Sequence, residues 1–437
     1  MCNFGTDLRR NGAAYWQCEA SKDSSSWKYV LTEAMTSHIC ATLPLNFSGP
    51  AARLLRSTFR RLIDRFDSQF PNAKGRCIKN SDLSCKGGVL HSCQRFIRAE
   101  TRAQSFHAGD CNAKCPRIRW DEASYRRSVN PRAVIADLNS RLKRLLYCKA
   151  SSNTMAISHV WSHGQGGRPD DGINLCLHKK YCSLAKTLGC ESYRIDSTCI
   201  PDDEQLRTEA IKSINSIFRD SKVTLISDQD KQSVSIDNSS IEELETLLSV
   251  LLVCDWGVRA WTMLEAIRGN TSIQILCRDD NTIVLKDVLQ RMHQFEAVNL
   301  AVLLGCVQHL LSSVHVGSDK ETEEVGHLLR QRYASREGDE ILIWGLLSIS
   351  NATKSVHDFW RLQRDVKSAF LVSSACRIEA VPGLSWAPGT PYSYIRPQQR
   401  SVELGNGLHQ NYSVYYPSYD GRGSQNVQRT PKDLFGK

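Results

Sequence analysis

Three short segments in the middle of the chain carry side chains that could do chemistry on a nucleotide-like ligand. They read SHVWSHG, RIDSTCIPDDEQ and RAWTMLEA, and they begin at residues 158, 194 and 259. Tryptophan rings can stack on a planar base, a glycine-rich turn lets backbone amides approach a phosphate or ribose, and a carboxylate can hold ribose hydroxyls. The candidate ligand-binding or catalytic residues in these segments are Ser158, Trp161, Gly164, Asp196, Trp261 and Glu265.

Each of these residues also has a plainer structural interpretation. Asp196 follows an apolar run, where a carboxylate either bonds a ribose hydroxyl or caps the next turn, and we favour the capping role. Glu265 either offers its carboxylate to a ligand or pairs with Arg259 or Arg268, and both interpretations stay open. The turn that starts at Gly164 matches no standard phosphate-binding motif, so a flexible loop is an equal alternative.

Two further side chains in these segments are interpreted as structural. A lone histidine near a strand end, such as His159, is more often a hydrogen-bonded structural residue than an acid or base. Cys199 has no histidine and asparagine pattern nearby that would support a nucleophile, and small buried thiols are common in proteins. We therefore assign neither residue a chemical role.

The sequence around the segments predicts an α/β fold with a small doubly wound parallel sheet. Short apolar runs alternate with helical patterns, which is typical of parallel strands joined by helical crossovers. The expected strands are at 154–161, 192–196, 222–227 and 272–277, and the expected helices are at 174–188, from 203 onwards and at 241–253. Ligands bind such sheets outside the carboxyl ends of the strands, where the first two segments fall. The third segment opens a helix that could face the same edge.

The order of the three segments resembles the fungal heterokaryon incompatibility (HET) domain. In that family, an apolar strand ending S-H/Y-V-W with a glycine turn precedes a strand ending I-D-x-x-C-I and then R-x-W-T-x-x-E, and all three patterns follow one another here. The resemblance covers the middle third of the chain. Two positions depart from it: Tyr193 and Arg194 stand where an aromatic residue usually precedes I-D, and Leu264 stands where the family has Gln.

The resemblance implies a TIR-like core and an activity. The HET domain is structurally akin to TIR domains, several of which cleave NAD with a glutamate in a W-C-x-x-E-L segment. Trp261 and Glu265 fall in that place here. The resemblance therefore implies that Glu265 is catalytic and that NAD is a candidate substrate. It does not imply a bound cofactor.

A biological role follows from the same resemblance. HET proteins mediate non-self recognition signalling and programmed cell death in fungi, so the implied partners are other HET or incompatibility proteins, or further copies of this chain. The alternative in the same pathway is a non-enzymatic interaction or oligomerisation module, which the departure at Leu264 favours. The basic first third would suit a nucleic acid, but no nucleic-acid-binding motif accompanies it, so we expect no such partner.

Cysteine and histidine residues near position 100 could assemble a metal site. One tetrahedral zinc could be built from such ligands, but their spacing matches no standard zinc finger, so our main expectation is no metal. A second group, Cys176, His178 and Cys182, lies on an expected helix on which 176 and 182 do not share a face with 178, so we expect a surface there. The first group consists of Cys85, His91, Cys93, His107, Cys111 and Cys115, and its four-cysteine alternative is Cys85, Cys93, Cys111 and Cys115.

The chain as a whole has the composition of a folded protein with a basic first third. Residues 1–150 hold 26 Lys and Arg against 12 Asp and Glu. The 17 cysteines have no repeating frame and the start has no apolar signal core, so we expect reduced thiols in the cytoplasm and no membrane span. The expected divisions are a basic, cysteine-rich and mainly helical region at 1–120, a lead-in helix at 121–150, the HET domain at 151–290, a helical region at 291–395 and a disordered tail at 396–437.

Overall fold

The computed structural model describes residues 106–137, 144–294 and 322–389 with short gaps in each range, and two short pieces at 76–84 and 401–403. Most of the region at 1–105 and of the tail at 396–437 lies outside these ranges. The expectations for those segments, including a disordered tail, therefore stay predictions.

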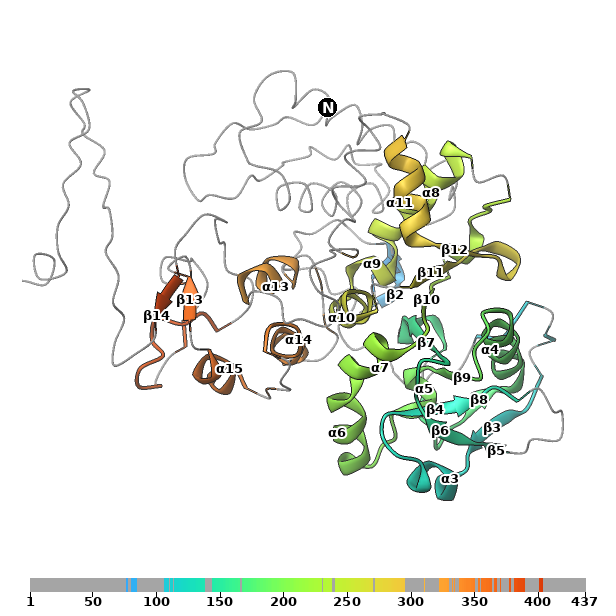
Figure 1. Ribbon diagram of the computed structural model, residues 1–437, viewed down its shortest axis with the longest axis horizontal. Coiled ribbons are helices and arrows are strands. Elements are labelled where there is room, and N and C mark those ends of the chain that lie inside the picture. The colour runs from blue at the N-terminus through green and yellow to red at the C-terminus, as the bar shows by residue number, and fades with distance from the viewer. Residues whose placement is uncertain are drawn as a thin grey trace, which may run out of the picture.

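A seven-stranded sheet forms the centre of the described structure (Figure 1). Its middle four strands are parallel and lie in the order β9, β7, β10, β11. All four coincide with the apolar runs of the sequence, because a strand covered on both faces carries few polar positions. The four predicted strands are thereby confirmed. Their bounds are Thr154–His159 for β7, Ser192–Arg194 for β9, Val223–Ser227 for β10 and Ile273–Leu276 for β11.

Antiparallel strands at both edges make the sheet mixed. β12 (Thr282–Val284) pairs with β11 on one side, while β4 (Arg132–Ile135) pairs with β9 and β6 (Tyr147–Lys149) pairs with β4 on the other. The prediction of a purely parallel sheet is therefore wrong at its edges. Each of these strands has only three or four residues, which is too short for the alternation of a strand to stand out in the sequence.

The lead-in helix expected at 121–150 is wrong for most of its length. Helix α3 covers Glu122–Arg127, and the Asp121 carboxylate caps it by accepting a 2.7 Å hydrogen bond from the Ser124 amide. Pro131 follows shortly after, and it lacks an N–H donor and disfavours the helical conformation of Asn130. The chain therefore turns into strands β4 and β6 instead of continuing as a helix.

The described part of the N-terminal region consists of strands, where we expected mainly helix. β1 (Arg76–Cys77) and β2 (Asn80–Ser84) form an antiparallel pair. A separate three-stranded sheet joins β3 (Arg117–Trp120) to β5 (Arg144–Leu145) and β8 (Ile173–Asn174). This small sheet places β3, just before α3, beside β8, which leads directly into helix α4.

Helices lie on both faces of the central sheet (Figure 1). On one face, Met155 and Ile157 of β7 share a hydrophobic cluster with helix α4. On the other, Ala156 packs with α7 and α10, and Ile226 packs with α8. Successive residues of a strand point to opposite faces, so one apolar run serves both layers. The helix bounds are Leu175–Thr187 (α4), Asp196–Cys199 (α5), Glu204–Lys212 (α6), Ile214–Asp220 (α7), Ile241–Val253 (α8), Asp255–Val258 (α9), Ala260–Arg268 (α10) and Leu285–Gln294 (α11).

The helix expected from residue 203 onwards is two helices, α6 and α7, that meet at Ser213. The Ser213 hydroxyl donates to the Ala210 carbonyl at 2.9 Å, and its oxygen lies 3.2 Å from the Asn130 Oδ1 atom. Asn130 in turn donates to the Glu209 carbonyl at 3.0 Å. Serine and asparagine side chains that bond the backbone compete with regular helix hydrogen bonds, which explains the break.

The described C-terminal region is built mainly of helices that pack on α7 and α10. Helix α14 is apolar all round and buried on nearly every side, and its Trp344 stacks on Phe359 with ring centroids 4.3 Å apart. No helix among the described residues is long and apolar enough to cross a membrane. The elements are α13 (Thr322–Leu329), α14 (Asp339–Ser348), α15 (Val356–Leu362) and the antiparallel pair β13 (Asp365–Lys367) and β14 (Ser401–Glu403).

The contact between the end of α10 and strand β10 leaves no space for a side chain at Gly269. A Cβ atom there would lie 2.0 Å from the Thr224 Oγ1 atom and 2.8 Å from its Cβ atom. We expect Gly269→Ala to lower the free energy of unfolding by about 1–3 kcal/mol, the usual cost of overpacking a core. Urea denaturation measures this change. Gly109→Ala is the matched control, because a Cβ at Gly109 meets nothing within 4 Å, and an equal loss in both variants would contradict the prediction.

Candidate functional site

Glu265 lies on α10 and points its carboxyl group at strand β7. It is buried, and the Ser158 hydroxyl donates a hydrogen bond to its Oε2 atom. The Trp256 Nε1–H of α9 donates to the same Ser158 oxygen at 2.7 Å. Helix α9, strand β7 and helix α10 are thus joined by one buried chain of hydrogen bonds. The structure brings together Ser158 and Glu265, which the sequence placed in different segments.

Burial raises the pKa of Glu265 to about 8, and the negative charge of Asp196 adds to the effect. The hydrogen bond from Ser158 and the positive charges of Arg259 and Arg194 act in the opposite direction. At neutral pH, Glu265 therefore carries its proton most of the time. A carboxyl group with a pKa near the working pH can hold or release a proton, which is a property of many catalytic carboxyls.

A cavity of about 100 Å³ opens beside Glu265. It receives side chains from the carboxyl end of β7, from the start of α5, from α6 and α7, from α10 and from the start of α14. Four of the six sequence-predicted residues line it, namely Trp161, Asp196, Trp261 and Glu265, and Ser158 lies directly behind Glu265. The other lining residues are His159, Arg168, Ile200, Arg207, Ile211, Ile214, Arg259 and Asp339.

The two tryptophans of the cavity are held by polar partners. Trp161 begins a 3₁₀ turn directly after β7, and the Arg168 guanidinium lies over its ring at 4.9 Å from the centroid. Arg168 is itself fixed by the Ile200 carbonyl at 3.1 Å and the Asp202 carboxylate at 3.2 Å. Trp261 donates from Nε1 to the Asp339 carboxylate at 2.7 Å. Both rings are therefore positioned before any ligand arrives.

Asp196 does not cap the helix that follows it, so the favoured capping interpretation is wrong. Ile195 occupies the cap position of α5 and Asp196 is the first helical residue. The Asp196 carboxylate instead accepts from the Arg194 guanidinium at 3.4 Å and lines the cavity. Burial raises its pKa, while Arg194 and Arg168 oppose that rise. A carboxylate in this position faces whatever occupies the cavity.

His159, which was interpreted as structural from the sequence, is one of the eight lining residues outside the predicted set. Its side chain is 5% exposed, and among the described residues neither ring nitrogen has a hydrogen-bond partner. Burial, together with the charge of Arg259, lowers its pKa to about 3, so the imidazole is neutral. Its ring is nearly parallel to that of Trp161, with centroids 6.3 Å apart. The one sequence signal was its alternation with Ser158, which puts it on the same side of the strand end as Trp161.

Gly164 is buried but does not line the cavity. Its φ of 74° lies in the left-handed region that favours glycine, and this conformation ends the 3₁₀ turn of Trp161. Its carbonyl accepts from the Phe106 amide at 3.2 Å. The glycine therefore shapes the turn and connects it to Phe106. Its binding of a phosphate stays a prediction.

Leu264, which departs from the HET pattern, is fully buried. It belongs to the cluster that includes Trp344 and Leu347 of α14. A polar side chain at this position would lie in an apolar contact between helices, so leucine fits this chain's C-terminal packing. Arg259 and Arg268, the expected alternative partners of Glu265, differ in their placement: Arg259 lines the cavity, and Arg268 donates to the Leu346 carbonyl at 2.6 Å.

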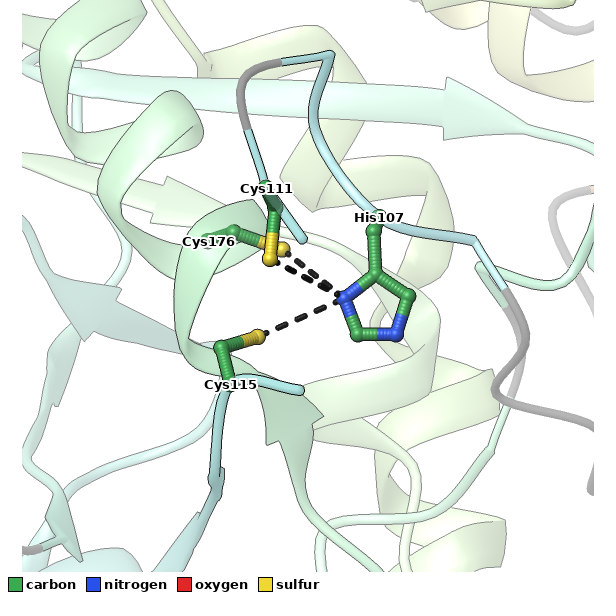
Figure 2. Close-up of side chains that lie close together, drawn as sticks. All are labelled: His107, Cys111, Cys115 and Cys176. Atoms are coloured by element: carbon green, nitrogen blue, oxygen red, sulfur yellow. Dashed lines mark hydrogen bonds between the residues drawn. The ribbon is translucent and has the colours of Figure 1, made fainter. Parts of the chain in front are cut away.

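Two members of the four-cysteine metal alternative have described side chains. Cys111 and Cys115 lie close to His107 and to Cys176, the second residue of α4 (Figure 2). Cys85 and Cys93 lie outside the described residues. The Cys182 Sγ atom lies 3.6 Å from the His178 Nε2 atom, and both side chains are buried. The expectation that these two residues lie on different helix faces and at the surface was therefore wrong.

We expect the free energy of unfolding to fall as the pH rises from 6.5 to 8. In this window folded Glu265 keeps its proton up to about 8, whereas an unfolded glutamate has lost it above the ordinary value of 4.5. The unfolded state then binds fewer protons, so stability falls by at most about 1.4 kcal/mol per pH unit. Below 6.5, His159 acts in the opposite direction, because its folded pKa of about 3 makes stability rise with pH up to its ordinary value of 6.5.

Urea denaturation at a series of pH values tests this expectation with Glu265→Gln. The variant cannot ionise at this position, so its stability should stay flat between pH 6.5 and 8. Glu191→Gln is the control, because Glu191 is an exposed residue after α4. It should keep the wild-type slope of stability against pH. An unchanged slope in Glu265→Gln would show that Glu265 does not have a raised pKa.

No known protein family, curated protein or solved structure matches this chain. The resemblance to the HET and TIR families therefore depends on the three segments of the sequence.

Proposed function

We propose that this protein is a HET-domain protein with a TIR-like core that cleaves NAD, with Glu265 as the catalytic residue. In this proposal it acts in the cytoplasm in non-self recognition and programmed cell death, with other incompatibility proteins or further copies of itself as partners. The observation that carries the proposal is the convergence of all three sequence segments on one cavity. Trp161, Asp196 and Glu265 come from separate segments and line the same space.

The strand order supports a doubly wound core. The first two parallel strands along the chain, β7 and β9, are neighbours, while the third and fourth, β10 and β11, continue on the other side of β7. The order thus reverses between β7 and β10, and ligands of open α/β sheets bind at the carboxyl ends of the strands at such a reversal. The cavity lies at this carboxyl edge, on the β9 side of β7, where His159 ends β7, Trp161 follows it and Asp196 follows β9.

The charges in the cavity support a ligand with both an anionic and a cationic part. Arg168, Arg207 and Arg259 line one cavity, and arginine is well suited to bind phosphate oxygens. Glu265 and Asp196 offer carboxyl groups in the same space. NAD has a negatively charged pyrophosphate and a positively charged nicotinamide ring, so its two ends match these two sets of side chains.

The reaction requires one ionised carboxyl near the ribose. Water adds to the ribose carbon as the bond to nicotinamide breaks, giving ADP-ribose, nicotinamide and a proton. Positive charge develops on the sugar in the transition state, and an ionised Glu265 would stabilise it. The cationic nicotinamide ring would itself favour the ionised form of Glu265, because an opposite charge nearby lowers the pKa of a carboxyl group.

The size of the cavity limits how NAD can bind. Its volume of about 100 Å³ is smaller than the roughly 300–1,000 Å³ of pockets that enclose a drug-sized ligand. We therefore place the nicotinamide and its ribose in the cavity, with the pyrophosphate at the arginines and the adenosine outside. Arg207, which is partly exposed, suits a position at the rim.

A non-enzymatic interaction module is the second candidate. The observation that favours it is the state of Glu265, whose Oε2 atom already accepts from Ser158 and whose raised pKa keeps it mainly protonated at neutral pH. A buried carboxyl of this kind can serve the packing of α10 alone. This candidate predicts self-association of the chain without loss of NAD.

The two candidates are separated by the release of nicotinamide from NAD by the purified chain. We expect Glu265→Gln to lower kcat at least about 100-fold, the usual range for removing an electrostatic stabiliser. The wild-type kcat/KM should rise with pH up to about 8, because it depends on the ionisation of Glu265 in the free protein. Glu191→Gln is the control and should keep full activity. Equal NAD turnover in wild type and Glu265→Gln would show that Glu265 is not the catalytic residue. Association of the wild type without any NAD loss would favour the interaction module.

A second variant tests the placement of the pyrophosphate. Arg207→Gln should raise KM for NAD about 10-fold or more with little change in kcat, since charge-assisted hydrogen bonds contribute about 1.5–3 kcal/mol. Arg219→Gln is the matched control, because Arg219 is an exposed arginine paired with Asp220 outside the cavity. The same steady-state assay gives both constants, and an unchanged KM in Arg207→Gln would remove Arg207 from the binding site.

A further inference from the structure

Three cysteine thiols converge on a single imidazole nitrogen beside the start of α4 (Figure 2). The His107 Nδ1 atom lies 3.4 Å from the Cys111 Sγ atom, 3.4 Å from the Cys115 Sγ atom and 3.5 Å from the Cys176 Sγ atom. All four potential ligand atoms lie within 4.8 Å of one another. From this geometry we infer that His107, Cys111, Cys115 and Cys176 bind one Zn²⁺ ion, which holds the 106–115 segment to α4.

Hydrogen bonding alone does not account for the arrangement. A neutral imidazole nitrogen that carries no proton has one lone pair and accepts one good hydrogen bond, and thiols are weak donors. Three thiols at nearly equal distances from one nitrogen exceed that capacity. A metal ion at the centre of the group instead gives each of the four atoms a bond of its own.

The distances agree with tetrahedral zinc. Zinc binds thiolate sulfur at about 2.3 Å and histidine nitrogen at about 2.0–2.1 Å, so a tetrahedral site separates nitrogen from sulfur by about 3.6 Å. The three observed separations of 3.4–3.5 Å are close to this value. A set of three thiolates and one histidine is a known ligand set of structural zinc, and sulfur-rich sets exclude the hard cations Mg²⁺ and Ca²⁺.

The surrounding backbone fits thiolate ligands. The Ala108 amide donates to the Cys176 sulfur at 3.3 Å, a contact that favours a negatively charged sulfur. The His107 Nε2 atom, on the far side of the ring, lies beside the Asn174 side chain. Asn174 also donates to the Phe106 carbonyl at 2.8 Å, so the segment that carries His107 is fixed next to α4.

The proton and charge changes of binding are simple. Each of the three thiols releases one proton as its sulfur binds the metal, while His107 binds through a nitrogen that carries none. Three thiolates and Zn²⁺ leave the site with one negative charge. All four coordination positions are supplied by protein, so the ion has no open position for a substrate, and its role is structural.

The ion would connect the N-terminal segment to the cavity. Phe106 precedes His107 and donates from its amide to the Gly164 carbonyl, in the turn that carries Trp161. Cys176 is separated from Cys115 by 60 intervening residues, so a bond through zinc removes much conformational freedom from the unfolded chain. This site is independent of the proposed NAD cleavage, because no residue of the group lines the cavity.

Metal analysis of the full chain, purified without chelator, tests the inference. We expect one Zn²⁺ per chain, and we expect Cys115→Ser and Cys176→Ser to lose most of it. Cys148→Ser is the matched control, because Cys148 is a partly buried cysteine on β6 outside the group. The double variant Cys85→Ser/Cys93→Ser should keep its zinc, which separates this group from the four-cysteine alternative.

Cobalt substitution gives a readout that does not depend on variants that fold. After removal of zinc from the wild type, Co²⁺ should produce a thiolate-to-cobalt charge-transfer band and the strong visible bands of a tetrahedral site. The inference is overturned by wild-type protein that holds no zinc and gives no such bands, or by zinc that stays in both Cys115→Ser and Cys176→Ser. Loss of zinc from Cys85→Ser/Cys93→Ser would also overturn this ligand set.

Discussion

The free-energy cost of burying a carboxyl group is lowered when the group is neutral and hydrogen-bonded, and Glu265 meets both conditions. Ser158 donates to it, Trp256 donates to Ser158 at 2.7 Å, and burial keeps its proton in place up to a pH of about 8. This chain of contacts fixes the register of α10 against β7. Trp261, one turn earlier on α10, lines the same cavity as Glu265.

The cavity depends on residues from the C-terminal helices as well as on the sheet. Trp261 donates to Asp339 at the start of α14, and Arg268 donates to the Leu346 carbonyl in the same helix. Met263 and Leu264 share a hydrophobic cluster with α14. A domain that ended near residue 290 would lack α14, and the apolar face of α10 that packs on it would be exposed. The segment from 151 to 290 therefore does not have a closed core by itself.

On its other side, the cavity depends on the chain before the sheet. The Gly164 carbonyl accepts a hydrogen bond from the amide of Phe106, which precedes His107. Three cysteine thiols lie near the His107 Nδ1 atom. The turn that carries Trp161 is thus held from the N-terminal side, and the Trp261 ring is held from the C-terminal side by Asp339. Parts of the chain outside the three sequence segments therefore help to position both tryptophans, and changes in those parts would alter the cavity.

The sequence by itself determined the four parallel strands, α4 and α8, because long apolar runs and amphipathic periods are local patterns. Trp161 and Asp196 were singled out because each follows an apolar run, and Trp261 and Glu265 because their segment resembles those of the HET and TIR families. Only the tertiary structure decided that these four line one cavity, that His159 joins them, and that Cys176 meets Cys111 and Cys115. These are contacts between residues far apart in the chain, and the spacing of a sequence contains no measure of which distant elements pack together.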